Sequence, residues 1–399
     1  MKVLFVLGHP NPFPGAGWTR IGFFADFLSK NGHSVEVLGT FSRSYFQKRG
    51  LKRYNYFNIF NLIFNIGRGF HPLLFILNSF MSFIFSFFFE IARKPHVTVI
   101  SIPPGKVGIG ASMACKLLGI KYIIDYRDEW EDYILGINTS KIYKGVYSIV
   151  KNFMTKIYTK GNLTVVVTPF FAKNLYLRGV KNVKVVPNGA DANIFVPCNK
   201  KKARRKLGLC EDVFIIVYNG LIGAYYKLDV VIKALKKLKG SLRGKVKLMI
   251  VGDGPDLMKL LSAAKNLNLE NNVCYLGVKD NKKELAEILS AADVGIIPGL
   301  YTQGQLPVKF YEYCACGLPV IATIDRDSLL AKFIIRYKIG VVCPPSNEEK
   351  LAETIYWLYA HKPFTNTAGK RARRFVEENF DRNKIAKTFL KLIESLGHN

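Results

Sequence analysis

The sequence predicts an α/β protein made of two doubly wound, Rossmann-like domains that face a cleft. Short apolar runs of strand length alternate with amphipathic runs of helical spacing along most of the chain. Several of the strand-length runs end in glycine turns, and 399 residues are too many for one ordinary core. Alternating strands and helices form parallel sheets, whose ligand sites lie at the carboxyl ends of the strands.

The first half opens with a βαβ unit. An apolar strand over 3–7 ends at Gly8, residues 21–28 have helical spacing up to Gly32, and a second strand covers 35–38. Further strands are expected at 97–102, 122–125, 163–168 and 183–187.

The second half repeats this alternation from about residue 199. The patterns predict strands at 213–219, 246–252, 273–276, 294–298 and 320–323, and helices at 228–238, 256–266 and 284–290. We expect domains at 1–192 and 193–378, linked by the turn-rich residues 187–197. A C-terminal helix at 384–396, within 379–399, is expected to return to the first domain.

Residues 54–92 depart from the alternation because they are strongly aromatic. From Gly69 to Phe89 there is no Asp, Glu, Lys or Arg, and basic residues flank the whole segment on both sides. A single membrane span would separate strands that belong to one sheet, so a re-entrant or interfacial segment is favoured. The alternative is a buried helix of the first domain.

Composition restricts the partners. The formal net charge is +29, which attracts nucleic acid, anionic membranes or phosphorylated substrates. Seven scattered cysteines without a CxxC pair support neither a zinc site nor a disulfide framework, and no cofactor is indicated. The first strand is too short for a signal peptide, so a cytosolic location is expected.

Two strand-end turns are candidate phosphate sites. Residues 220–227 (GLIGAYYK) place Gly220 and Lys227 between a strand and a helix, where backbone N–H groups face an anion. Residues 251–255 (VGDGP) carry Gly252 and Gly254, which allow close backbone approach to a ligand. Each turn alone is a weak signal, since a lysine at a helix start is usually only solvated.

A third segment, residues 305–323 (QLPVKFYEYCACGLPVIAT), joins these turns at the sheet edge. Pro307 suits a helix start, and Lys309 and Glu312 share one helix face. A carboxylate there can accept the two hydroxyls of a ribose, and a lysine beside it can meet phosphate. A surface ion pair is the plain alternative.

These segments together resemble the GT-B glycosyltransferases of family four, and DYRDEW (125–130) resembles the Asp-Trp motif of their membrane-associated branch. The resemblance implies that Glu312 binds ribose, that Lys227 binds the diphosphate, and that Asp128 faces the sugar. The remaining donor-binding residues that it implies are Gly15, Gly17, Gly220, Gly252, Gly254, Gly277, Val278, Pro307 and Lys309.

Two positions depart from the family pattern. Gly304 stands where an earlier glutamate is usual, and Leu221 replaces an arginine six residues before Lys227. Arg326, Lys309 or Arg20 could compensate for the lost charge.

The expected reaction is sugar transfer from a UDP- or GDP-type donor to a lipid-linked glycan or lipid acceptor at the cytoplasmic face of the cell membrane. The resemblance implies a retaining reaction. No carboxylate cluster of DxD type stands at a strand end, so the reaction is expected to be metal-independent, and residues 54–92 with the basic surface predict peripheral or monotopic membrane contact. A nucleotide-sugar 2-epimerase and a catalytically inactive, membrane-bound nucleotide-sugar-binding subunit remain alternatives. No nucleic-acid-binding module is visible.

Overall fold

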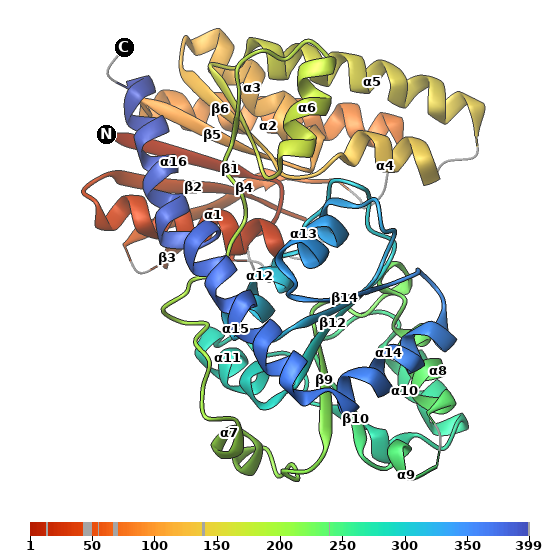
Figure 1. Cartoon of the computed structure of the whole chain (residues 1–399). Helices are drawn as coiled ribbons and strands as arrows, with labels where there is room; N and C mark the ends of the chain where they lie inside the picture. Colours follow the sequence, from red (N-terminus) through yellow and green to blue (C-terminus); the bar gives the residue numbers. More distant parts are fainter. Residues whose placement is uncertain are drawn as a thin grey trace. The chain divides into compact units, whose positions relative to one another are not determined.

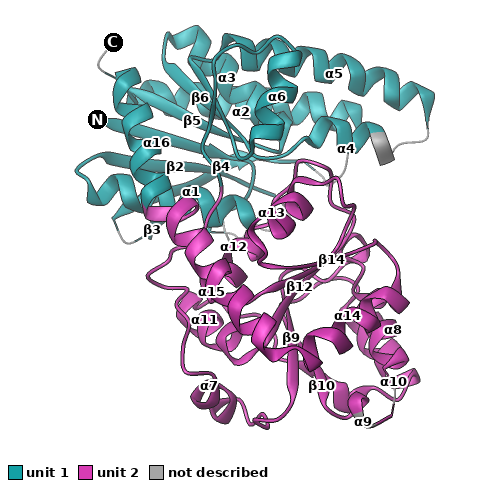
Figure 2. Cartoon of the chain, viewed as in Figure 1, with its two compact units in different colours: residues 1–187, 384–399 teal, residues 188–383 magenta. Residues whose placement is uncertain are grey.

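The computed structural model describes residues 1–12, 15–42, 50–54, 56–66, 71–137, 140–238 and 240–397. The chain forms two compact units, coloured separately in Figure 2: unit 1 comprises residues 1–187 and 384–399, and unit 2 comprises residues 188–383. Each unit contains its own largely parallel sheet, which confirms the predicted fold class. The C-terminal helix α16 (Arg382–Gly397) lies mainly within unit 1.

Unit 1 has an eight-stranded sheet in the order β3-β4-β2-β1-β5-β6-β7-β8. Among the strands of this sheet that the structure describes, only the edge pair β3–β4 is antiparallel. The strands are β1 (Lys2–Leu7), β2 (Ser34–Phe41), β3 (Gly50–Tyr54), β4 (Phe57–Phe64), β5 (Val97–Ile102), β6 (Lys121–Tyr126), β7 (Leu163–Val166) and β8 (Val183–Val185). β1 pairs with both β2 and β5, so the predicted βαβ unit forms the centre of this sheet.

Helices cover both faces of this sheet, as Figure 1 shows. The helices are α1 (Ala16–Lys30), α2 (Pro72–Arg93), α3 (Gly105–Leu118), α4 (Trp130–Ile137), α5 (Lys141–Lys160) and α6 (Pro169–Leu177), together with α16. α1 and α16 share one core, where the rings of Phe24 and Phe389 stack with centroids 4.5 Å apart. α2 to α6 contribute to the core on the opposite face.

The prediction of one membrane-contacting segment over 54–92 was wrong for its first part. β4 lies inside the sheet between β2 and β3, and its side chains Phe57, Ile59 and Ile63 are buried. The aromatic excess there fits a strand that is buried on both faces, because such a strand is apolar along its whole length. The flanking residues Lys48 and Arg49, and Gly69 at the start of the uncharged run, lie outside the described residues.

The second part of that segment forms α2, whose polarity is inverted relative to an ordinary surface helix. The buried positions include Asn78, Ser79, Ser82, Ser86 and Glu90. The exposed positions include Leu73, Ile76, Leu77, Phe80, Phe88 and Ile91. A surface helix of a soluble domain normally buries its apolar stripe and exposes its polar one.

Small residues explain how α2 packs so closely on α3. A Cβ atom on Gly110 of α3 would lie 2.4 Å from the backbone oxygen of Ser79 and 2.6 Å from the Cβ atom of Ser82. The Ser82 hydroxyl donates to the backbone oxygen of Val107 at 2.9 Å. Such contacts through small and hydroxyl residues let two helix backbones approach closely.

Unit 2 has a six-stranded parallel sheet in the order β11-β10-β9-β12-β13-β14. Its strands are β9 (Phe214–Asn219), β10 (Val246–Val251), β11 (Val273–Tyr275), β12 (Val294–Pro298), β13 (Val320–Thr323) and β14 (Gly340–Cys343). Its helices are α7 (Lys200–Lys206), η2 (Ala224–Tyr226), α8 (Leu228–Lys237), α9 (Gly240–Arg243), α10 (Leu257–Asn266), η3 (Glu270–Asn272), α11 (Lys282–Ala291), α12 (Val308–Ala315), α13 (Leu329–Tyr337), α14 (Glu348–Ala360) and α15 (Lys362–Asn379).

The unit 2 sheet is buried on both faces. Ile215 and Val217 of β9 belong to one hydrophobic cluster, whereas Ile216 and Tyr218 belong to the other. Alternate side chains of a strand point to opposite faces, so helices must cover both sides. This arrangement leaves the ends of the strands as the place for polar chemistry.

Candidate functional site

The best candidate site in unit 2 lies where the strand order of its sheet reverses. The chain runs outward from β9 to β10 and β11, then returns to β12 on the other side of β9. All these strands are parallel, so their carboxyl ends meet at one edge. Doubly wound sheets bind ligands at the point of reversal, which here lies between β9 and β12.

Glu312 on α12 lies at this edge and contacts the last residue of β9. Its Oε2 atom accepts a hydrogen bond from Asn219 Nδ2 at 2.8 Å, and the glutamate side chain is almost fully buried. Its Oε1 atom lies 3.9 Å from Lys282 Nζ at the start of α11. The sequence prediction singled out Glu312 but missed Asn219 and Lys282.

The Glu312–Asn219 pair retains unused hydrogen-bonding capacity. Among the described residues, the buried Asn219 Oδ1 atom has no hydrogen-bond partner. An ionised carboxylate offers about four acceptor positions, of which only one is used by Asn219. The pair can therefore accept hydrogen bonds from hydroxyl groups, as a sugar diol would supply.

Lys309 lies one turn before Glu312 on α12 and is enclosed by tyrosines. Its Nζ atom lies 3.8 Å from the ring centroid of Tyr218 and 4.8 Å from that of Tyr226. No hydrogen-bond acceptor reaches this buried Nζ atom within the described residues. Burial lowers the pKa of Lys309 to about 7, although the carboxylate of Glu312 acts in the opposite direction.

The two glycine turns pack against each other at the same edge. A Cβ atom on Gly252 would lie 2.0 Å from the backbone oxygen of Gly220, and one on Gly254 would lie 2.0 Å from that of Ile222. The turns are also joined by the hydrogen bond from Gly220 N to Val251 O at 2.9 Å. Turn-to-turn packing thus requires glycine here, independently of any ligand.

The other predicted donor-binding residues of unit 2 follow β11 or precede α12 and α8. Gly277 accepts the backbone hydrogen bond of Gly252 N at 2.9 Å, and the adjacent Val278 is exposed. Pro307 caps the N-terminus of α12, as predicted from its position. Lys227 has a left-handed backbone (φ 46°) and precedes α8.

Both departures from the family pattern lie close to the site. Leu221 is an exposed apolar residue whose backbone oxygen accepts the hydroxyl of Tyr218 at 2.6 Å. Gly304 is buried in the loop between β12 and α12. Neither position supplies a charge at this edge.

In unit 1, the predicted residues lie at the carboxyl edge of the other sheet. Gly15 precedes α1, and a Cβ atom on Gly17 would lie 2.8 Å from Arg127 Nη1. Asp128 lies two residues after the end of β6, and its Oδ1 atom accepts from Glu129 N at 2.9 Å. Gly17 therefore accommodates an arginine side chain within unit 1.

The other charged residues around this edge form a closed network. Arg20 donates from Nε to Asp125 Oδ1 at 3.0 Å and also to the backbone oxygens of Val186 and Pro187. Asp125 further accepts from Ser101 Oγ at 3.2 Å. Arg20 is thus committed within unit 1 and does not serve as a spare cation.

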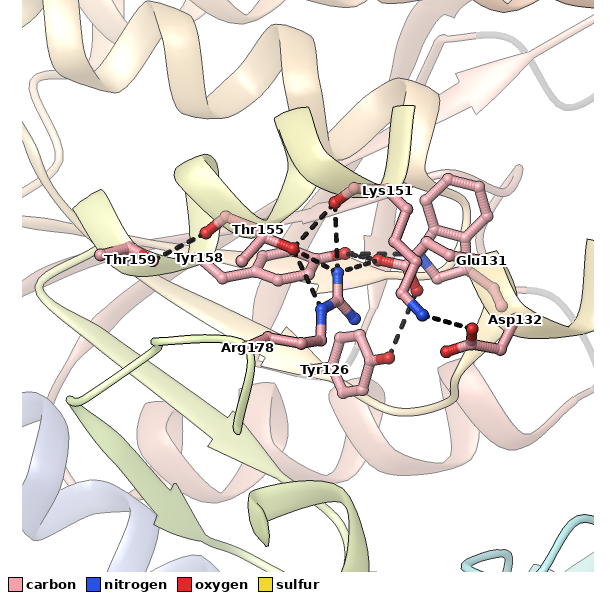
Figure 3. Close-up of polar contacts among 9 residues, drawn as sticks. Tyr126, Glu131, Asp132, Lys151, Thr155, Tyr158, Thr159 and Arg178 are labelled. Atoms are coloured by element: carbon pink, nitrogen blue, oxygen red, sulfur yellow. Dashed lines mark hydrogen bonds and ion pairs between the residues drawn. The ribbon is translucent and has the colours of Figure 1, made fainter. Parts of the chain in front are cut away.

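A second network joins α4, α5 and α6, as Figure 3 shows. Buried Glu131 accepts from Tyr158 Oη at 2.8 Å, from Tyr126 Oη at 3.3 Å and from Arg178 Nη2 at 3.4 Å. Burial raises the pKa of Glu131, which the Arg178 charge opposes. Tyr126 of DYRDEW and Glu131, which follows the motif directly, therefore hold β6, α4, α5 and the end of α6 together. In the described ranges, no group of three or more His, Cys, Asp and Glu side chains is placed to hold a metal ion.

Comparisons with known proteins match this chain to glycosyltransferases. Residues 199–375 match the family described as Glycosyl transferases group 1. The N-acetyl-alpha-D-glucosaminyl L-malate synthase of Bacillus anthracis is 26% identical over 209 residues, which is 52% of each chain. The chain thus spans about half the length of the curated relatives that it matches.

Solved structures match the fold over nearly the whole chain. Anabaena HepE, solved in complex with UDP, aligns with a TM-score of 0.75 at 16% identity, covering 99% of this chain and 100% of that one. WaaG, a glycosyltransferase involved in lipopolysaccharide biosynthesis, aligns with a TM-score of 0.73 at 17% identity, covering 98% and 99%. The chain therefore has the GT-B fold of these glycosyltransferases, and its residues 199–375 match the glycosyltransferase group 1 family.

Proposed function

We propose that the protein transfers a sugar from a nucleotide-sugar donor to a lipid-linked glycan or lipid acceptor at the cytoplasmic face of the cell membrane. The observation that carries the donor part is Glu312, hydrogen-bonded to Asn219 where the strand order of a glycosyltransferase group 1 domain reverses. The UDP bound to HepE supports a nucleotide donor of the UDP type, with GDP as the other candidate.

Donor binding would use the edge residues in distinct ways. Glu312 would accept the ribose hydroxyls, because its carboxylate keeps free acceptor positions beside Asn219. Lys227 and Lys309 would face the diphosphate, and cationic side chains there stabilise the negative charge that develops on the leaving group. Asp128 would orient the acceptor or the sugar.

The proposed reaction retains the configuration of the sugar and needs no metal ion. The sugar's bond to the diphosphate breaks as the acceptor hydroxyl attacks from the same face, and the leaving phosphate takes the acceptor's proton. This route requires no nucleophile from the protein. The cationic side chains would supply the charge stabilisation that a bound metal ion gives elsewhere.

The lipid acceptor and the membrane contact are supported by α2. Among the described residues, α2 is the one helix long and apolar enough to cross a membrane, with only 28% of its apolar window buried. The strands before and after it, β4 and β5, belong to one sheet, which favours a helix lying in the interface. The exposed apolar face of α2, defined by Leu73, Ile76, Phe80, Phe88 and Ile91, would enter the lipid.

The lysines of α5 also support membrane contact on the face that carries α2. α5 lies on the same face of the sheet as α2 and carries many lysines but no acidic residue. It also exposes Ile142, Ile149 and Phe153. Each lysine near an anionic lipid surface contributes about 1 kcal/mol to binding. WaaG, which shares the fold, is described as acting in lipopolysaccharide biosynthesis, a lipid-linked product.

Labelled transfer tests the function. Purified protein is incubated with labelled UDP-, GDP- and dTDP-sugars and a lipid extract of the host, and label in the organic phase is counted. We expect label from one donor, and loss of that label with Glu312→Gln. Absence of transfer from every donor, with soluble acceptors also inactive, would contradict the proposal and favour the binding-subunit alternative.

Vesicle flotation tests the membrane contact separately. Wild-type protein should float with vesicles containing anionic lipids, whereas Ile76→Asp/Phe80→Asp should not, although its nucleotide binding stays intact. Lys233→Met on α8 of unit 2 serves as a matched surface control. Equal flotation of wild type and the double variant would exclude this face, and a dimer lost in that variant would assign it to a second copy instead.

A further inference from the structure

The last strand of the unit 2 sheet has an unpaired edge. β14 stands at one end of the strand order, and among the strands described it pairs only with β13. Its residues Gly340, Val341 and Val342 are only half-buried, whereas every residue of β13 is buried. An unpaired strand edge presents backbone N–H and C=O groups that can pair with a further strand.

The hydrogen bonds between the two strands show which backbone groups of β14 remain unpaired. Ile339 O and Cys343 O each accept a hydrogen bond of 3.0 Å from the side of β13. Alternate residues of a strand direct their backbone groups to the same neighbour, so Val341 also faces β13. The N–H and C=O groups of Gly340 and Val342 therefore point away from the sheet.

A groove of about 310 Å³ lies along this free edge, in the place of a further strand. Its apolar lining comes from Ile335 of α13, Val341 and Val342 of β14, and Phe364 of α15. Val342 packs with the hydrophobic cluster on one face of the sheet, whereas Val341 and Phe364 pack with the cluster on the other face. Alternate side chains of an added strand would therefore meet apolar surface on both sides.

Two basic side chains line the same groove. Arg326 lies in the loop before α13, and Lys338 follows α13 directly. Neither side chain makes a hydrogen bond or an ion pair within the described part of the chain. Arg326, which the sequence suggested as a substitute charge for the donor site, thus belongs to this groove. Both charged residues of its lining are basic, so the groove is complementary to acidic groups.

We propose that the free edge of β14 binds an extended segment of a partner protein by strand addition, and that this segment is apolar in its middle and acidic at its ends. Gly340 and Val342 would pair with its backbone, its apolar side chains would enter the groove, and its acidic ones would meet Arg326 and Lys338. β14 has four residues, so the paired part is about equally short. The proposal does not depend on sugar transfer.

Charge distinguishes this partner from a second copy of the chain. The chain carries 58 Lys and Arg against 29 Asp and Glu. A symmetric pair of β14 strands would bring two copies of Arg326 and Lys338 to one edge, and like charges facing each other in a sheet are unfavourable. A lysine at a sheet edge can also serve only to prevent pairing, in which case no segment binds there.

Peptide binding tests the proposal on the full-length protein. The probe is the fluorescein-labelled peptide Glu-Glu-Val-Thr-Val-Ile-Glu-Glu. Its counterpart Glu-Glu-Val-Pro-Val-Pro-Glu-Glu has the same charge but cannot pair as a strand, so it measures the general attraction of a basic protein. We expect only the first peptide to bind specifically. Arg326→Met/Lys338→Met should weaken its binding roughly tenfold, because two exposed charge pairs are lost, whereas the surface control Lys233→Met should not.

A proline variant separates backbone pairing from charge. The N–H of Val342 points away from β13, so Val342→Pro removes no hydrogen bond of the sheet. It should weaken peptide binding roughly tenfold or more, whereas Val342→Ala, which keeps the N–H, should weaken it less. Thermal unfolding verifies that both variants are folded. In wild type, the bound peptide should slow hydrogen exchange at the amides of Gly340 and Val342, but not at Val341, which is already bonded.

Other results would overturn the proposal. No binding, or equal affinity for the two peptides, would leave only the general attraction between a basic protein and an acidic ligand. Binding that Val342→Pro leaves unchanged, or that adds no protection at Gly340 and Val342, would exclude strand addition. A concentration-dependent dimer of wild type that Val342→Pro abolishes would assign the edge to a second copy of the chain.

Discussion

The two units use the same kind of sheet edge in opposite ways. At the carboxyl edge of unit 1, buried Asp125 is paired with Arg20, which also binds two backbone oxygens. At the carboxyl edge of unit 2, Lys309 Nζ and Asn219 Oδ1 are buried, and neither has a hydrogen-bond partner in the described part of the chain. Since buried polar groups are normally satisfied, Lys309 and Asn219 are the groups of the unit 2 edge prepared for a ligand, whereas the Arg20–Asp125 pair of unit 1 is satisfied within the protein.

The largest effect on stability should come from breaking the Arg20–Asp125 pair at the carboxyl edge of unit 1. Arg20→Leu leaves the fully buried Asp125 with only the more distant Arg127, whose Nε atom lies 4.0 Å from Asp125 Oδ2. Removing one partner of a buried ion pair typically costs about 3–5 kcal/mol of unfolding free energy. Urea unfolding measures this loss. The exposed Lys30–Asp26 pair of α1 is the control, because Lys30→Met should cost less than about 1 kcal/mol. Equal stability of the two variants would remove the distinction between the edges.

At the carboxyl edge of unit 2, we expect a smaller effect on the free energy of unfolding and a larger effect on donor binding. Glu312→Gln keeps the size of the side chain and an acceptor for Asn219 but loses the charge. We expect about 1.5–3 kcal/mol of lost donor binding, or roughly 10- to 100-fold. Donor titrations and urea unfolding are measured together. Strong destabilisation with unchanged donor affinity would mean that Glu312 is structural.

The pH dependence of stability should differ between the units, with slopes of at most about 1.4 kcal/mol per pH unit. Burial raises the pKa of Glu90 on α2 to about 7, so folding of unit 1 binds a proton between about pH 4.3 and 7 and its stability falls as pH rises there. The pKa of Lys309, lowered to about 7, makes unit 2 gain stability as pH rises from 7 toward about 10.4.

Urea unfolding across pH 4–10 measures both slopes. Glu90→Gln should flatten the acid slope, and Lys309→Met should flatten the alkaline one. If either variant keeps the wild-type slope, the corresponding group does not titrate as the structure indicates. The two windows do not overlap, so each variant serves as the control for the other.

The sequence predicted the architecture well because strand-length apolar runs and helical spacing are local properties. It located most strands of both sheets, and the C-terminal helix lies at 382–397 as expected from 384–396. It missed β3, β4 and β14 as strands. β4 was missed because the phenylalanine-rich run of α2 follows it in the sequence. A run that is apolar throughout does not distinguish a buried strand from a helix.

The candidate site was predictable in part. Glu312 and Lys309 could be selected because their spacing places them on one helix face, at a recognisable family motif. The prediction missed Asn219, Lys282, Tyr218 and Tyr226, because they come from separate elements that only the fold brings together. Gly252 and Gly254 must be glycine because the two turns pack against each other, which the spacing in the sequence alone could not reveal.

Hydrogen exchange of the whole protein, with and without saturating UDP or GDP, tests the central claim most directly. The nucleotide that binds should give its strongest protection at residues 219–227, 251–255 and 308–316 in unit 2, with little change at 20, 101 and 125 in the satisfied network of unit 1. Protection concentrated at that network instead, with residues 308–316 unchanged, would contradict the assignment of the donor site.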